Sequence, residues 1–123
     1  MVAYADWQWA GAPPVAEVVA FALKRRGGVL LLDTFQKAPS RETGTVPTLL
    51  DLLSRQQITA LCGACRDAGV LVALAGSLRA AEIETLKAAR PNWFAVRGAV
   101  CDEGRREAAV SARKVRALVE LLT

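Results

Sequence analysis

The chain contains no histidine among its 123 residues, and this absence excludes several kinds of active site. A Ser-His-Asp triad, a Cys-His pair and an HExxH zinc site all require an imidazole group. Acid and base chemistry must therefore come from lysine, arginine, carboxylate, hydroxyl or thiol groups. The pair Cys62 and Cys65 lacks the further ligands that a zinc site needs, and it lies within an apolar helical stripe. We therefore expect buried, unreactive thiols there, and neither a metal nor a cofactor.

Long apolar runs and dense basic stretches are also absent. No apolar run approaches the roughly 20 residues that cross a bilayer, and residues 1–6 lack the basic start of a signal peptide. The net charge of +4, from 16 basic and 12 acidic residues, is spread along the chain. This distribution favours small anions over nucleic acid, because a duplex-binding surface usually shows a dense basic stripe. The three cysteines, an odd number, fit a reducing compartment, so we expect a cytoplasmic protein without a membrane partner.

Short apolar segments alternate with segments of helical period. Runs rich in apolar or β-branched residues predict strands at 1–5, 29–33, 70–75 and 93–97. After each of them, apolar residues recur at helical spacing, within 15–23, 50–68, 83–86 and 112–122. A chain of this length can bury a core without disulfides, so these elements predict a single domain.

The order of four strands, each followed by a helix, predicts an α/β fold. The strand interiors are apolar, which is typical of parallel strands that crossover helices cover on both faces. Two architectures stay open: a flavodoxin-like open sheet, or half of an eight-stranded TIM barrel. In both of them, ligands bind where the carboxyl ends of the strands meet the following loops.

Polar residues stand at the end of every predicted strand. They are Asp6, Asp33, Gly76 with Ser77, and Arg97 with Gly98. One polar residue at a strand end is ordinary capping, but four out of four, carrying both signs of charge, indicate a functional rim. Since parallel strands end on the same side of a sheet, we expect Asp6, Asp33, Ser77 and Arg97 at one edge.

Asp33 and Lys37 are the pair best suited to moving protons. An acid at a strand end and an amine four residues later can reach each other if the loop folds back over the rim. A partly buried lysine can exchange its proton near neutral pH. The alternative is a surface ion pair of little energetic consequence.

Gly76 and Ser77, followed by helix-forming residues, predict a helix N-terminus that could bind phosphate. Arg97 and Gly98 end the next strand and add a fixed cation and a close backbone approach. The loops after the last two strands are also the common phosphate site of barrels. The alternative is a serine N-cap beside a solvated arginine.

These segments together resemble the (5-formylfuran-3-yl)methyl phosphate synthase family of methanofuran biosynthesis. The resemblance is carried by Tyr4-Ala5-Asp6, Leu32-Asp33-Thr34 with Lys37, Ala73-Leu74-Ala75-Gly76-Ser77, and Val96-Arg97-Gly98-Ala99 with Cys101. It implies a TIM barrel that condenses two glyceraldehyde 3-phosphate molecules through a lysine Schiff base and eliminates phosphate and water. Asp33 and Lys37 would be an active-site acid and lysine, and Gly76, Ser77, Arg97 and Gly98 the phosphate-binding rim, with Asp6 also binding substrate.

The resemblance covers only the C-terminal half of that barrel, with βα units five to eight on residues 1–123. The Schiff-base lysine and the principal general-base lysine of the family lie on early strands that have no counterpart here. The resemblance therefore implies a lyase activity that depends on an N-terminal half-barrel chain or on self-association. The alternative is a non-catalytic module that binds a phosphate ligand, or serves in assembly, and is derived from the same barrel.

Overall fold

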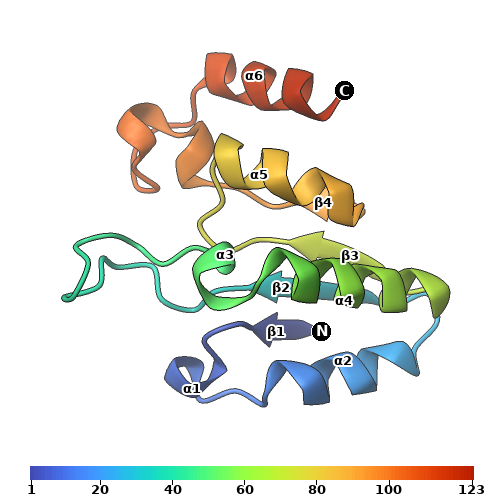
Figure 1. The fold of residues 1–123 in the computed structure, drawn as a ribbon. Coiled ribbons are helices and arrows are strands. Elements are labelled where there is room, and N and C mark those ends of the chain that lie inside the picture. Colours follow the sequence, from blue (N-terminus) through green and yellow to red (C-terminus); the bar gives the residue numbers. More distant parts are fainter.

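Four parallel strands form one sheet in the computed structural model, which describes residues 1–123. The strands are β1 (Val2–Tyr4), β2 (Val29–Asp33), β3 (Leu71–Leu74) and β4 (Trp93–Phe94), and they neighbour one another in chain order. In Figure 1, the arrowheads of β1, β2 and β3 point to the side of the molecule where the long loops lie. The α/β class is confirmed, and so is the expectation that the predicted rim residues follow strand ends at one edge.

Helices follow each strand. They are α1 (Trp7–Ala10), α2 (Val15–Leu23), α3 (Leu49–Leu52), α4 (Arg55–Asp67), α5 (Ala80–Leu86) and α6 (Ala112–Leu122). Three short 3-10 turns accompany them: η1 (Lys87–Ala89), η2 (Gly98–Val100) and η3 (Asp102–Gly104). In Figure 1, α2 runs beside β1, and α5 and α6 lie beyond β3 at the other side of the sheet. No helix is both long and apolar enough to cross a membrane.

The predicted continuous helix over 50–68 is in fact two helices. The backbone at Leu53 is extended, with φ −129° and ψ 139°, and this ends α3. Ser54 then starts α4 with a capping box, because its hydroxyl accepts from the Gln57 backbone N–H while the Gln57 side chain accepts from the Ser54 backbone N–H. The short helix α1, which follows Asp6, was not predicted either.

One face of the sheet carries the hydrophobic core. Side chains that alternate along the strands point to this face and are buried beneath the helices: Ala3, Leu30, Leu32, Val72 and Leu74. Ile58, Leu61 and Cys65 on α4 and Ile83 and Leu86 on α5 complete the same cluster. The core therefore follows directly from the period of two along the strands and the apolar stripes of the helices.

The opposite face of the sheet is apolar but open. The strand register places Val2, Leu31, Ala73 and Trp93 in one row across this face. Val2 and Trp93 are exposed, and Val29 and Leu71 on the same face are exposed as well. The expectation that helices cover both faces is thus wrong for these residues, since all the helices that pack on the sheet contribute to the core of one face.

Candidate active site

A cavity of about 840 Å³ opens at the carboxyl ends of β2, β3 and β4. Six of the seven predicted site residues line it: Asp33, Lys37, Gly76, Ser77, Arg97 and Gly98. They come from three different loops, so no sequence-local feature brings them together. Thr45, Thr48 and further arginines complete the wall, which is mostly polar.

Asp33 and Lys37 form the expected ion pair at this cavity. Lys37 Nζ lies 3.0 Å from Asp33 Oδ1 and also donates to Thr34 Oγ1 at 3.1 Å. The side chains are 32% and 21% exposed for Lys37 and Asp33, so the pair is partly shielded yet open to a ligand. Asp33 Oδ1 also accepts from the Thr34 backbone N–H at 2.7 Å, which fixes the carboxylate at the strand end.

Thr34 contributes to the candidate site, although the sequence alone predicted no role for it. It is fully buried, and its hydroxyl provides the second acceptor for the Lys37 ammonium group. In the sequence, only its place directly after a strand-end acid points to Thr34. A buried hydroxyl needs a hydrogen-bond partner, and here that partner is Lys37.

Gly76 and Ser77 form a strained turn and not the start of a helix. Helix α5 begins at Ala80, so the prediction that Gly76 and Ser77 open a helix is wrong. Both residues have positive φ, 109° and 54°, and the Gly76 carbonyl accepts from the Leu49 backbone N–H at 3.0 Å. Non-glycine residues with positive φ are uncommon and concentrate at functional sites, which draws attention to Ser77.

Arg97 lies beyond β4, because that strand ends at Phe94 and not at the predicted residue 97. Its Nε donates to the Arg106 carbonyl at 2.8 Å, and Arg79 similarly donates to the Gly104 carbonyl at 3.2 Å. These two bonds fasten the 102–107 segment at the cavity. The terminal nitrogens of Arg97 stay available for an anion. Arg79, Arg105 and Arg106 line the same wall, as do the acidic residues Asp51, Glu82 and Glu107, and Arg105 pairs with Glu107 at 3.9 Å.

The amino-acid sequence of this chain is similar to those of known proteins. The family model described as 4-HFC-P synthase matches residues 1–119. The chain belongs to the 4-HFC-P synthase family. A (5-formylfuran-3-yl)methyl phosphate synthase of Methanopyrus kandleri is 31% identical over 120 residues, which is 97% of this chain and 48% of that protein. A Methylorubrum extorquens protein assigned provisionally to the same synthase is 32% identical over 75 residues, 61% of this chain and 32% of that protein.

The sequence match to the 4-HFC-P synthase family covers nearly the whole of this chain, but only part of the length of its relatives. The chain spans about half the length of the Methanopyrus kandleri protein and about a third of the Methylorubrum extorquens one. The resemblance drawn from the four strand-end segments is therefore confirmed at the level of the family. The roles of the individual residues stay predictions.

Asp6 differs from the other predicted site residues of this family member. It is buried and does not line the cavity. Its two carboxylate oxygens accept from the backbone N–H groups of Phe35 at 2.7 Å and Gln36 at 2.9 Å. Asp6 thus ties the end of β1 to the loop that carries Lys37, a contact that positions the site. A direct contact between Asp6 and substrate stays a prediction.

The cysteine pair plays no part in this site. Cys62 and Cys65 are buried on the core face of α4, as expected, and no cluster of metal-ligating groups is present. Burial, together with the neighbouring Cys65, raises the pKa of the Cys62 thiol to about 11, so the thiol stays protonated at neutral pH. Burial raises the pKa of Cys65 as well.

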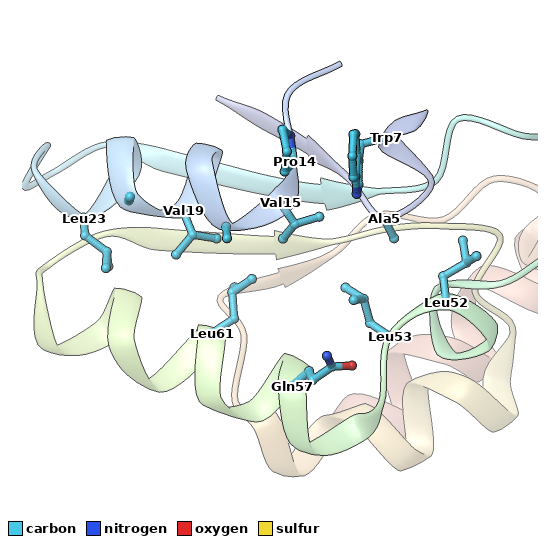
Figure 2. A pocket seen from close by; sticks show the side chains of 12 residues that line it. Ala5, Trp7, Pro14, Val15, Val19, Leu23, Leu52, Leu53, Gln57 and Leu61 are labelled. Carbon is cyan, nitrogen blue, oxygen red and sulfur yellow. The ribbon is translucent and has the colours of Figure 1, made fainter. Parts of the chain in front are cut away.

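A second cavity, of about 620 Å³, lies among α1, α2, α3 and α4 (Figure 2). Its walls are apolar, with Val15, Val19 and Leu23 of α2 facing Leu61 of α4. Gln57 is its main polar group, and Trp7 of α1 lines it as well. A groove without charged groups can bind an apolar side chain, but it offers nothing for acid–base chemistry.

Proposed function

We propose that this chain forms the phosphate-binding and proton-transferring part of a (5-formylfuran-3-yl)methyl phosphate synthase. The observation that carries the proposal is the single cavity that gathers an acid–amine pair and an arginine-rich rim. Family membership supports the product class, since the Methanopyrus kandleri relative is named for this synthase. The substrates are two glyceraldehyde 3-phosphate molecules, as the sequence resemblance implies.

Asp33 and Lys37 suit the proton transfers of such a condensation. Elimination of water requires a proton for the departing hydroxyl, whereas phosphate can leave as an anion, and both eliminations require a base for the proton removed from carbon. The Lys37 ammonium group is held by two acceptors within 3.1 Å and can donate the proton to the departing hydroxyl. The neighbouring Asp33 carboxylate can accept a proton from substrate carbon and pass it to the Lys37 amine, which restores the ammonium group.

The rim suits the phosphate groups of the substrates. Arg97 keeps its terminal nitrogens free while its Nε is fastened to a carbonyl, so the guanidinium is oriented before ligand arrives. Ser77 offers a hydroxyl to the same cavity. An oriented guanidinium loses little conformational freedom on binding, which favours recognition of a phosphate oxygen pair.

Substituting Arg97 tests the phosphate site directly. Arg97→Ala removes charge-assisted hydrogen bonds of ~1.5 to 3 kcal/mol, so binding of glyceraldehyde 3-phosphate should weaken about 10- to 100-fold in calorimetric titration. Arg116→Ala, an exposed arginine on α6 away from the cavity, is the matched control and should bind like the parent. Equal affinity of the Arg97→Ala variant and the parent would remove the assignment.

A further inference from the structure

Basic residues gather at the end of the sheet opposite the candidate active site. Because the strands are parallel, the segments that lead into them lie at one end: residues 24–28 before β2, 66–69 before β3 and 87–92 before β4. In Figure 1 these segments lie on the side away from the long loops. We call the three segments together the basic end. It carries six exposed cationic side chains: Lys24, Arg25, Arg26, Arg66, Lys87 and Arg90.

The basic end carries the whole net positive charge of the chain. It holds six of the 16 basic residues and one of the 12 acidic residues, Asp67, which gives a net charge of +5. The remaining ten basic and eleven acidic residues give a net charge of −1. The charge is spread along the sequence because the three segments are distant from one another in the chain, and only the fold brings them together.

Helix dipoles explain only part of this charge. The carboxyl end of a helix carries about half a negative elementary charge, which favours a basic residue there. Helices α2, α4 and α5 all end here, so their dipoles offset roughly 1.5 of the positive charges. Lys87 is engaged within the chain, by Glu84 at 3.7 Å and by the Leu121 carbonyl at 2.8 Å. Even without Lys87, an excess of positive charge remains for an external anion.

Two arginines of the basic end are held in place by the chain itself. The Arg25 guanidinium lies 3.3 Å from the centroid of the Phe21 ring and donates to the Phe21 carbonyl at 3.2 Å. Arg26 lies along Gly69, where an added Cβ would come within 2.9 Å of Arg26 Cγ. Side chains that are already ordered lose less conformational freedom on binding, which favours recognition of an anion.

Arg90 occupies a backbone position that usually belongs to glycine. It ends η1 with φ 56° and ψ 53°, in the left-handed region, and its carbonyl accepts from Arg66 Nη2 at 3.1 Å. Glycine is the usual residue at such a position because it has no Cβ to clash. A residue with a side chain in a strained conformation points to a use for that side chain, here an exposed guanidinium.

We propose that the basic end binds a carboxylate-rich segment of a partner protein. Neighbouring strands lie about 4.8 Å apart, so the entrances of β2, β3 and β4 span roughly 10 Å. An extended peptide presents every second side chain about 7 Å apart, so two or three of its carboxylates reach the arginines together. This binding is independent of the proposed synthase reaction, because the basic end and the candidate active site lie at opposite ends of the strands.

Other anionic partners fit the basic end less well. Single nucleic-acid-binding modules bury about 600 to 1,000 Å² of protein surface, more than a region roughly 10 Å wide provides. Single-stranded nucleic acid stacks on aromatic side chains, and membrane surfaces are bound through exposed apolar ones. The three segments contain no aromatic residue and no exposed large hydrophobic residue. Charge pairing alone is left to them, and a short acidic peptide requires nothing more.

A fluorescently labelled hexaglutamate peptide, titrated into the full chain and followed by anisotropy, tests the proposal. Binding should weaken at least tenfold between about 10 and 150 mM salt, because salt screens exposed charges. Amide NMR shifts on binding should concentrate in residues 24–28, 66–69 and 87–92. This map distinguishes the basic end from the arginines of the candidate active site.

Two charge reversals provide a matched pair of variants. Arg26→Glu and Arg55→Glu change the net charge equally, but Arg55 is exposed at the start of α4, at the other end of the sheet. Arg26→Glu should weaken peptide binding about tenfold or more, whereas Arg55→Glu should change it less than about twofold. Arg90→Gly should weaken binding about threefold and raise the midpoint of thermal unfolding, because glycine relieves the strain.

Four results would overturn the proposal. They are the absence of peptide binding at low salt, equal effects of Arg26→Glu and Arg55→Glu, NMR shifts confined to the candidate active site, and tighter binding of an oligonucleotide or of phosphatidylserine vesicles than of the peptide. Circular dichroism checks that each variant folds. Arg90→Gly keeps the test decisive if Arg26→Glu unfolds the chain, since its loss of binding comes with a gain in stability.

Discussion

Gly76 links the turn after β3 to the Asp33–Lys37 pair of the candidate site. A Cβ at this position would lie 3.0 Å from Thr34 Cγ2 and 3.0 Å from Leu49 Cβ, and φ is +109°. Thr34 in turn holds the Lys37 ammonium group. We therefore expect a change at the proposed phosphate-binding turn to reach Lys37 through Thr34, although Gly76 and Lys37 are far apart in the sequence.

Replacing Gly76 with alanine should affect both stability and binding. The positive φ alone costs ~1 to 3 kcal/mol for a residue with a side chain, and the two close contacts add to it. Urea unfolding should show this loss, and titration should show weaker phosphate binding. Gly63→Ala is the control, because Gly63 lies within α4 with open space around it and should gain ~0.5 to 1 kcal/mol. Equal stability of the two variants would contradict the strain at Gly76.

At the scale of elements, the break between α3 and α4 decides where the apolar stripe of α4 lies. The capping box of Ser54 and Gln57 starts α4 at the position that turns Ile58 and Leu61 towards the core. The sequence predicted the stripe but not the break, because Leu53 is apolar and fits a helical period. Its extended backbone is visible only in the folded chain.

Removing this cap should destabilise the protein without changing the site. Ser54→Ala deletes the acceptor for the Gln57 backbone N–H and should cost ~1 kcal/mol in the free energy of unfolding, measured with urea. Ser54→Asp keeps an acceptor at the N-cap and should stay near the parent. A loss of the same size in the aspartate variant would show that the hydroxyl acts through something other than capping.

At the scale of the whole molecule, the chain alone should lack synthase activity. The lysine that the resemblance assigns to the Schiff base is not among the matching segments of these 123 residues. Incubation with glyceraldehyde 3-phosphate and borohydride should therefore leave Lys37 unmodified by mass spectrometry, and no furan product should form. Addition of the N-terminal half of a family member should restore turnover. An adduct on Lys37, together with turnover by the isolated chain, would show that the assigned roles are wrong.

The sequence alone determined the class of fold, the order of strands and helices, and six of the residues that line the cavity. It did so because the period of two along strands, the period of 3.6 along helices and the placement of polar residues at strand ends are local properties. Parallel strands then carry those polar ends to one side. The absence of histidine likewise restricted the acid–base chemistry to other side chains, since composition does not depend on folding.

Only the tertiary structure decided what each of these residues touches. It placed Asp6 on two backbone N–H groups, gave Lys37 its second acceptor in Thr34, and turned Gly76 and Ser77 into a strained turn. It also left one apolar face of the sheet open. Contacts between residues distant along the chain depend on how elements pack, and the pattern of a single strand or helix carries no record of the partner that it will meet.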